Sequence, residues 1–164
     1  MPYLFLRPGN FRTGEWAEID FQAREWRIQP GKMKLPAPHI TPLAPQVVDM
    51  LEELHQLTGK RSRYLFPSLR TADRPMSENT LNAAFRRMGY SRDDVTGHGF
   101  RHMASTLLHE QGFASDAIGR QLGHMDRNEV RATCNYAQYL DERRIMMQAW
   151  GDFLDELRVE AGQN

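Results

Sequence analysis

The segment 98–139 gathers side chains that could handle a phosphate group. It holds four of the six histidines, the only cysteine, and an arginine three residues after the first of those histidines. On a helix, His98 and Arg101 would project from one face. His124 follows a Leu-Gly pair, where a helix should stop. The candidates for chemistry are, in chain order, His98, Arg101, His124, Cys134 and Tyr136.

Displacement at a phosphodiester needs positive charge against the two non-bridging oxygens. Arginine suits this task because its planar, permanently charged guanidinium matches a phosphate. Arg101 is one candidate, and Arg7, beside Pro8-Gly9, is the second. A lysine at the tip of a hairpin, Lys34, could protonate a leaving 5′-oxygen, and His124 could bind a phosphate oxygen or transfer protons.

Each of these residues also has a plainer interpretation. Arg101 would pair with a surface carboxylate, and Lys34 would be a solvated turn lysine. His98 and His124 would cap helices. A metal site is not expected: His98 and His102 are four residues apart, but the chain has no His-Glu-x-x-His pattern and no Cys-x-x-Cys pair. No cofactor is expected either.

Composition indicates an ordinary globular protein, with 40% hydrophobic and 26% charged residues. The length of 164 residues suits one domain, 1–164. One cysteine excludes an internal disulfide framework, and there is no apolar run long enough for a membrane span and no secretory signal. We therefore expect a protein of a reducing compartment, the cytoplasm, with no membrane partner.

Charge is unevenly distributed although the net charge is zero. Residues 1–140 contain 18 Lys and Arg against 15 Asp and Glu, whereas residues 141–164 contain 3 against 6. Four basic residues lie around the apolar sequence Tyr-Leu-Phe-Pro at 64–67 and indicate a basic loop: Lys60, Arg61, Arg63 and Arg70. A local basic surface of this kind is compatible with nucleic acid, although the total does not favour it.

The fold class expected from periodicity is α+β, mainly α-helical, with a small N-terminal antiparallel three-stranded sheet. The first residues look like a helix that Pro8-Gly9 would end or kink. Strands are expected at 16–21, 25–29 and 39–41. Helices are expected at 45–57, 77–88 with Ser77 as its cap, 98–111, 115–122, 128–139 and from 141 onward. The residues expected in the core include Met33, Met88, Met103, Ile145, Met146, Met147, Trp150 and Leu157.

Several motifs in one order resemble the tyrosine recombinases, in particular the integrases of phages and genomic islands. The segment LRPGNFRTGEWAEIDF resembles the first arginine box, and KMKLPAPHITPL resembles the hairpin lysine segment. FPSLRTADRPMSENTLNAAFRRMGY is similar to the connecting stretch. TGHGFRHMASTLLHEQG resembles the H-x-x-R box, QLGHMDRN the L-G/A-H box, and YLDERRIMMQAWGDFL the terminal helix.

The resemblance implies a tyrosine-recombinase catalytic domain that acts on double-stranded DNA at attachment sites. Arg7 and Arg101 would clamp the scissile phosphate, while His98 and His124 would assist proton transfer and phosphate binding. Lys34 would be the general acid. In this family a tyrosine attacks phosphorus and forms a 3′-phosphotyrosyl intermediate, without ATP or metal, inside a synaptic tetramer of the full-length protein.

The sequence departs from the family at the nucleophile. The family segment reads roughly V-R-A-x-Y-N-x-A-x-Y-L-x-E-R-R, and VRATCNYAQYLDERR puts Cys134 at the tyrosine position. Three explanations stay open: Cys134 abolishes strand cleavage, Tyr136 is recruited by local unwinding, or Cys134 itself attacks. On a helix Tyr136 would face away from that position.

The start of the chain also differs from the family, because the arm-type and core-binding modules that would precede this region are missing. The expectation is therefore an N-terminally truncated domain with weak, salt-sensitive DNA binding. Two alternatives to an integrase follow: a non-catalytic DNA-binding or assembly remnant, and a strand nickase like the type IB topoisomerases. The connecting stretch argues against the second.

Overall fold

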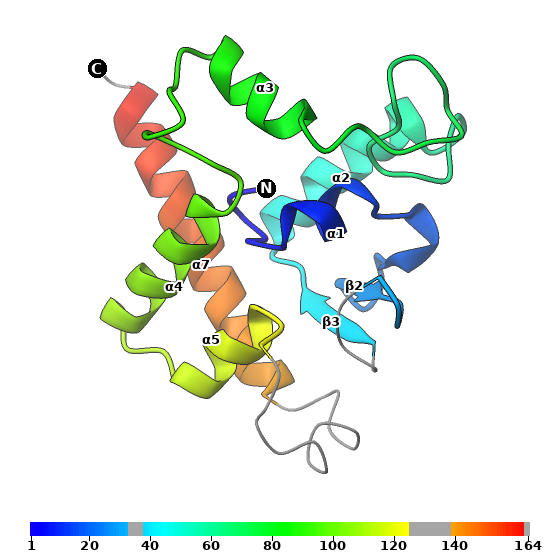
Figure 1. Cartoon of the computed structure of the whole chain (residues 1–164). Helices are drawn as coiled ribbons and strands as arrows, with labels where there is room; N and C mark the ends of the chain where they lie inside the picture. The colour runs from blue at the N-terminus through cyan, green and yellow to red at the C-terminus, as the bar shows by residue number, and fades with distance from the viewer. Residues whose placement is uncertain (33–37, 125–138, 163–164) are drawn as a thin grey trace.

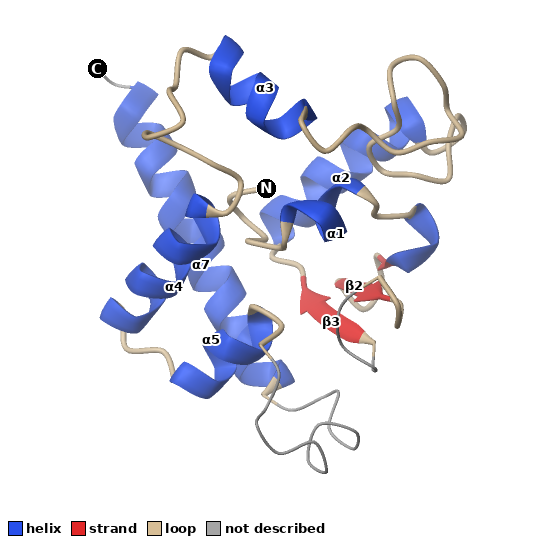
Figure 2. Ribbon diagram, viewed as in Figure 1, coloured by secondary structure: helices blue, strands red, loops and turns tan. Residues whose placement is uncertain are grey.

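The computed structural model describes residues 1–32, 38–124 and 139–162 (Figure 1). Helices account for about half of the described chain and strands for little of it (Figure 2). In chain order the elements are α1 (Pro8–Arg12), the 3-10 helix η1 (Trp16–Glu18), β1 (Ile19–Asp20), β2 (Glu25–Ile28), β3 (His39–Pro42), α2 (Pro45–Thr58), α3 (Thr80–Arg87), α4 (Gly99–Glu110), α5 (Ser115–Gln121) and α7 (Leu140–Gly162).

The sheet is antiparallel with the order β1-β2-β3, as the sequence predicts. Its central strand buries Trp26 and Ile28, which are 0% and 1% exposed. The expected strand at 16–21 is wrong in its first half, which forms η1. There the Glu15 N–H donates to the carboxylate of Glu18 at 3.0 Å, and this local bond satisfies a helix start instead of a sheet ladder.

The N-terminal residues form a turn, and the expected helix before Pro8 is wrong. The N–H groups of Leu4 and Phe5 both donate to the carbonyl of Met1, and both side chains are buried. Pro8 does not end a helix but begins one, because α1 has proline in its first turn, where the missing N–H has no cost. Arg7 therefore stands at the start of α1.

The central helices agree closely with the sequence pattern, with corrections in α3 and α4. The helix begins after Asn79, because the Ser77 hydroxyl bonds the hydroxyl of Thr80 (2.9 Å) and does not cap the backbone. Met88 is 71% exposed and Met103 on α4 is 39% exposed, so neither belongs to the core. The expected core residue Met33 and residues 128–138 of the expected helix 128–139 lie outside the described residues, and Tyr139 has φ +59°, which is not helical.

The last helix, α7, packs on its own domain. Trp150 is fully buried, its ring meets Phe5 edge-on at 5.9 Å, and its indole N–H donates to the carbonyl of Pro2 at 3.0 Å. Met146 is also fully buried, whereas Ile145 is 67% exposed. A further expected core residue, Leu157, is 43% exposed because the end of α7 extends past the residues it packs on.

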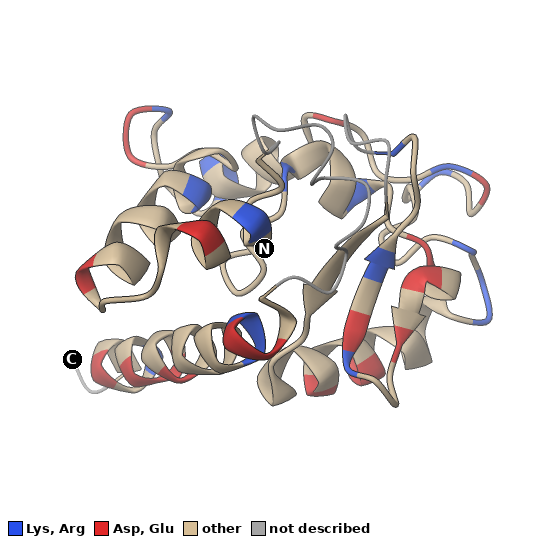
Figure 3. Cartoon of the chain, turned by 90° about the horizontal axis from the view of Figure 1, so that it is seen from below, with Lys and Arg blue, Asp and Glu red and all other residues tan. Residues whose placement is uncertain are grey.

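The helices form two groups around the buried N-terminal segment. Figure 1 shows α4, α5 and α7 on one side of the molecule and α2 with the sheet on the other. Acidic positions follow much of α7, the long helix that ends at C in Figure 3. The C-terminal excess of acidic residues is therefore concentrated on one helix.

Candidate functional site

Arg101 is held inside the protein by two backbone carbonyl groups. It lies on the first turn of α4 and is 8% exposed. Its guanidinium donates to the carbonyl oxygen of Phe5 at 2.6 Å and to that of Leu122 at 2.7 Å. The interpretation of Arg101 as half of a surface ion pair is therefore wrong.

Arg7 reaches the same end of α5 from the start of α1. Its guanidinium donates to the carbonyl oxygen of Gly123 at 3.2 Å, and Gly123 is the residue after Leu122. The two arginines thus hold consecutive carbonyl groups, which lie within a few ångströms of one another. Burial and the nearby charge of Arg7 lower the pKa of Arg101 to about 10, so Arg101 keeps its charge at neutral pH.

The end of α5 supplies a negative helix end for these two cations. The last carbonyl groups of a helix have no partner inside it and carry a partial negative charge. Gly123 has φ +65° and ends α5 in the left-handed conformation that glycine adopts without strain. The helix end therefore attracts and orients the guanidinium groups of Arg7 and Arg101. Their remaining N–H donors have no hydrogen-bond partner among the residues that the structure describes.

His124 follows directly and is exposed. Its backbone N–H donates to the carbonyl of Gly119 at 3.0 Å, which fixes the residue against α5. Partial burial, with the nearby charges of Arg101 and then Arg7, lowers the pKa of the imidazole below its ordinary value. His124 is therefore within the electrostatic field of both arginines. An anion bound by Arg7 and Arg101 would also interact with His124.

His98 occupies the cap position of α4, one turn before Arg101, and is exposed. Its side chain makes no capping hydrogen bond to the helix. His102 and His109 are exposed helix residues, and His109 contacts Ser105 and Ser115. The remaining candidates, Lys34, Cys134 and Tyr136, lie outside the described residues.

A further buried arginine, Arg143, contacts the last turn of α5, and the sequence pattern gave no sign of it. Arg143 on α7 is 0% exposed, and donates to the side-chain carbonyl of Gln121 at 2.6 and 3.0 Å and to the backbone carbonyl of Ile40. Burial, with the charge of Arg120 next, lowers its pKa to about 9. The side chain of Arg143 thereby fastens the last turn of α5 to β3 and α7.

His39 on β3 lies in the same region and is 4% exposed. Burial is the main reason that its pKa falls to about 3, and the charges of Arg143, Arg120 and Arg7 add to it. Its Nε2 atom has no hydrogen-bond partner among residues 1–32, 38–124 and 139–162. A neutral imidazole therefore sits behind the arginines that hold the end of α5.

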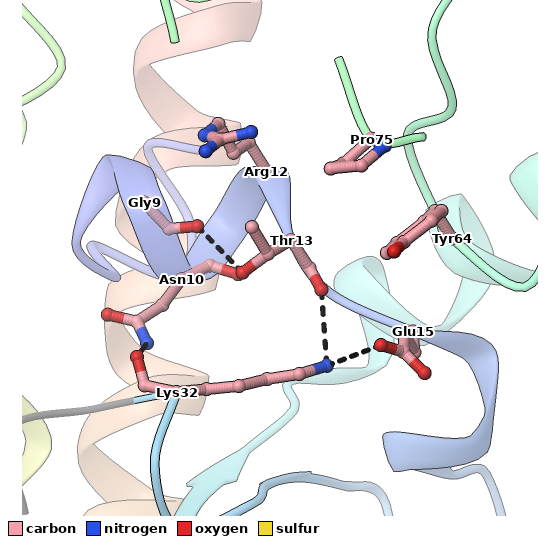
Figure 4. A pocket seen from close by; sticks show the side chains of 8 residues that line it. All are labelled: Gly9, Asn10, Arg12, Thr13, Glu15, Lys32, Tyr64 and Pro75. Atoms are coloured by element: carbon pink, nitrogen blue, oxygen red, sulfur yellow. Dashed lines mark hydrogen bonds and ion pairs between the residues drawn. The ribbon is translucent and has the colours of Figure 1, made fainter. Parts of the chain in front are cut away.

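A hollow of about 440 Å³ lies beside α1 and is lined in part by Asn10 and Lys32, two residues before Lys34 (Figure 4). The Asn10 amide donates to the carbonyl of Lys32 at 2.8 Å. The Lys32 ammonium pairs with Glu15 at 2.9 Å and with the buried Glu18 at 2.8 Å. These contacts fix the last described residue before Lys34 against α1, the helix that begins at Arg7.

Two further properties concern metals and membranes. Within the described part of the chain, no three His, Cys, Asp or Glu side chains are placed to hold a metal ion. In the same residues, no helix has the length and hydropathy needed to cross a membrane.

Comparison with known proteins identifies a matching protein family. A model of the phage integrase family matches residues 3–143. The chain is 44% identical over 167 residues to an integrase of Enterobacteria phage P4, with 92% of this chain and 38% of the relative covered. It is 41% identical over 148 residues to prophage integrase IntA of Escherichia coli (strain K12), with 90% and 35% covered. This chain thus spans about two fifths or less of the length of these relatives.

A likeness in structure supports the fold alone. The crystal structure of XerA recombinase matches with a TM-score of 0.65 at 23% sequence identity, over 86% of this chain and 53% of that one. The predicted α+β fold of a tyrosine-recombinase catalytic domain is therefore confirmed, with its small antiparallel sheet and mainly helical body.

Proposed function

Because this chain belongs to the phage integrase family, we propose that it is the catalytic domain of an integrase, which cuts and rejoins double-stranded DNA at attachment sites. The observation that carries the proposal is the hold of Arg7 and Arg101 on consecutive carbonyl groups at the end of α5. Two guanidinium groups oriented side by side can present their remaining donors to the two non-bridging oxygens of one phosphate.

The proposed reaction is a transesterification. The hydroxyl group of a tyrosine loses its proton to His98 or His124, its oxygen bonds to phosphorus, and the bond between phosphorus and the 5′-oxygen breaks. Lys34 gives the leaving oxygen its proton, while Arg7 and Arg101 stabilise the charge that develops on the phosphate. His98 and His124 assist phosphate binding and proton transfer. Rejoining is the reverse attack by a 5′-hydroxyl group, so the phosphodiester energy is conserved and no ATP is needed.

The nucleophile is the weak point, because Cys134 stands at the aligned tyrosine position. This observation favours a second candidate function, in which the chain binds DNA or joins an assembly without cutting. In that case Arg7, Arg101 and His124 still bind a backbone phosphate, and replacing Cys134 by tyrosine restores cleavage. Tyr136 two residues later is the other possible nucleophile.

The larger setting is also part of the proposal. The complete integrase would hold two DNA sites in a synaptic tetramer, with further modules gripping the duplex beside this domain. It would work in the bacterial cytoplasm, where its DNA substrate is. These statements rest on the family membership alone. The chain itself spans only part of the length of its relatives.

A nicked suicide duplex, which loses a short fragment on cleavage, tests the proposal. The duplex carries the recombination site from the end of the element that encodes this chain. The variants are Cys134→Tyr, Cys134→Ser, Tyr136→Phe, and Cys134→Tyr with Tyr136→Phe. A protein–DNA adduct that survives denaturant reports cleavage, and peptide mapping identifies the attached residue.

We expect an adduct with Cys134→Tyr, kept when Tyr136 is also phenylalanine, and none with the starting chain. If the starting chain forms an adduct and Tyr136→Phe abolishes it, Tyr136 is the nucleophile. If Cys134→Ser abolishes that adduct instead, Cys134 is the nucleophile. If no variant forms an adduct while all of them bind the duplex, the cleavage function is wrong and the DNA-binding remnant stands.

A further inference from the structure

The basic loop, residues 60–74, has an exposed leucine at its tip. Leu69 is 96% exposed, the highest value of any large apolar residue in the described chain. It is followed by Arg70, and both are exposed. The loop contains five basic residues and one acidic residue, Asp73. The five basic residues are Lys60, Arg61, Arg63, Arg70 and Arg74. All five side chains are exposed, and none of them forms an ion pair with a carboxylate among the described residues.

The tip is held in one shape although it is exposed. The Ser68 N–H donates to the carbonyl of Arg74 at 2.8 Å, and Pro67 pairs with Pro75 as an isolated bridge. The Ser62 hydroxyl donates to the carbonyl of Ala72 at 2.6 Å. The two sides of the loop are therefore tied together below Leu69, and little conformational entropy remains to be lost when the tip meets a partner.

The base of the loop rests on the helix that carries Arg7. Phe66 stacks on Phe11 of α1 with ring centroids 4.4 Å apart, and the Arg12 guanidinium donates to the carbonyl of Met76 at 3.0 Å. Phe11 lies one helical turn after Arg7, to whose carbonyl its N–H donates at 3.0 Å. One short helix thus sets the position of the loop relative to the proposed phosphate site.

We propose that the tip of this loop enters the minor groove of the DNA arm beside the cleaved phosphate, with Leu69 as an apolar wedge and Arg70 and Arg74 on the backbones that border it. Apolar side chains that part a base step, flanked by arginines, are the combination used by proteins that bind the minor groove.

The inference rests on the proposed function for its partner, duplex DNA, but does not involve the cleavage residues. A second partner would be another copy of this chain. On α7 an acidic hollow of about 450 Å³ includes Asp152, Glu156 and Val159, and would attract a basic loop with an apolar tip. The DNA partner is favoured because the loop is fixed to the helix that begins at Arg7, whereas the hollow lies on α7.

Binding of fluorescent recombination-site duplexes at a series of salt concentrations tests the wedge. Leu69→Ala is compared with Leu57→Ala, a leucine on α2 that is 74% exposed, and Arg70→Ala/Arg74→Ala is compared with Arg158→Ala on α7. We expect Leu69→Ala to weaken binding about tenfold with an unchanged salt slope, since an apolar contact is lost. The double arginine variant should lower the slope of log K against log salt by about 2.

A second readout uses duplexes with 2-aminopurine placed in turn at each step of one arm. The starting chain should raise the fluorescence at one step, which reports unstacking, and Leu69→Ala should abolish that rise. Equal affinity of Leu69→Ala and Leu57→Ala would overturn the wedge, even if Cys134→Tyr forms its adduct. Loss of self-association in Leu69→Ala, with DNA binding unchanged, would overturn it in favour of the second copy. If the starting chain binds no duplex, both the wedge and the proposed function fail.

Discussion

Arg7 and Arg101 come from segments more than ninety residues apart and donate to the carbonyl oxygens of Gly123 and Leu122, which are neighbours in the chain. The arrangement places two cations at the end of α5, where the helix is most negative. Neither guanidinium is used up by a carboxylate in the described residues. Their charge therefore remains for an anion from outside, which is the basis of each prediction about this site.

The two buried hydrogen bonds of Arg101 should make it important for folding as well as for binding. We expect Arg101→Lys to lower the free energy of unfolding by about 2 kcal/mol, because an ammonium cannot reproduce the planar fork that reaches both carbonyls. Arg87→Lys is the control, since Arg87 is exposed and bonds only a carbonyl of its own helix. Urea unfolding measures both, and equal losses would contradict the assigned role of Arg101.

An anion at this site should raise the pKa of His124. The charges of Arg101 and Arg7 help to lower that pKa in the free protein, and a bound sulfate offsets them and stabilises the imidazolium. By linkage, sulfate should bind more tightly as the pH falls below the ordinary histidine range. Titration of the His124 ring protons by NMR, with and without sulfate, measures the shift. The His109 ring is the control, and an unchanged His124 pKa would argue against a shared anion site.

Acid should destabilise the protein through His39. Its pKa is about 3 in the folded chain against 6.5 for an ordinary histidine, so the unfolded chain takes up a proton first as the pH falls. The free energy of unfolding contributed by this group is therefore constant above pH 6.5 and declines from there to about pH 3. Between pH 6.5 and about pH 3, the free energy of unfolding should decline less steeply in His39→Gln than in the starting chain. His109→Gln should keep the starting slope, and a matching slope in His39→Gln would contradict the buried neutral state.

Two neighbours on α7 should differ sharply when shortened to alanine. Met146 is fully buried and Ile145 is 67% exposed. We expect Met146→Ala to lower the free energy of unfolding by about 2–5 kcal/mol through the cavity it leaves, and Ile145→Ala to change it by less than about 0.5 kcal/mol. Similar losses in the two variants, measured in urea, would show that α7 is seated in a different rotation.

The sequence was sufficient for the fold class, because periodicity, turn residues and several motifs all agreed. It placed β2, β3, α2, α4 and α5 nearly to the residue. It failed where a side chain made a local bond that no pattern reveals, as in η1 with Glu18. It also failed for Ile145, Met88 and Met103, since an apolar residue at helical spacing is buried only if another element covers that face.

For the candidate site too, the sequence was sufficient for some features and not for others. Residue types and order were enough to single out Arg7, Arg101 and His124. The carbonyl groups that hold the arginines were not predictable, because every residue has a carbonyl and only the path of the chain decides which ones converge. Arg143 and His39 were missed for a related reason: β3, the end of α5 and the start of α7 meet there, and these segments are far apart in the chain. Lys34, Cys134 and Tyr136 remain predictions.

The central claim is that Arg7 and Arg101 bind one DNA phosphate, and a cycle of protein and DNA changes tests it most directly. The duplex carries either the normal phosphate or an uncharged methylphosphonate at the position where Cys134→Tyr forms its adduct. Binding of the starting chain, Arg7→Ala and Arg101→Ala to both duplexes gives the coupling between each arginine and that charge. We predict that methylphosphonate weakens binding of the starting chain, with a coupling of about 1–3 kcal/mol that disappears in each variant. Additive losses, with the methylphosphonate weakening all three proteins equally, would contradict the claim.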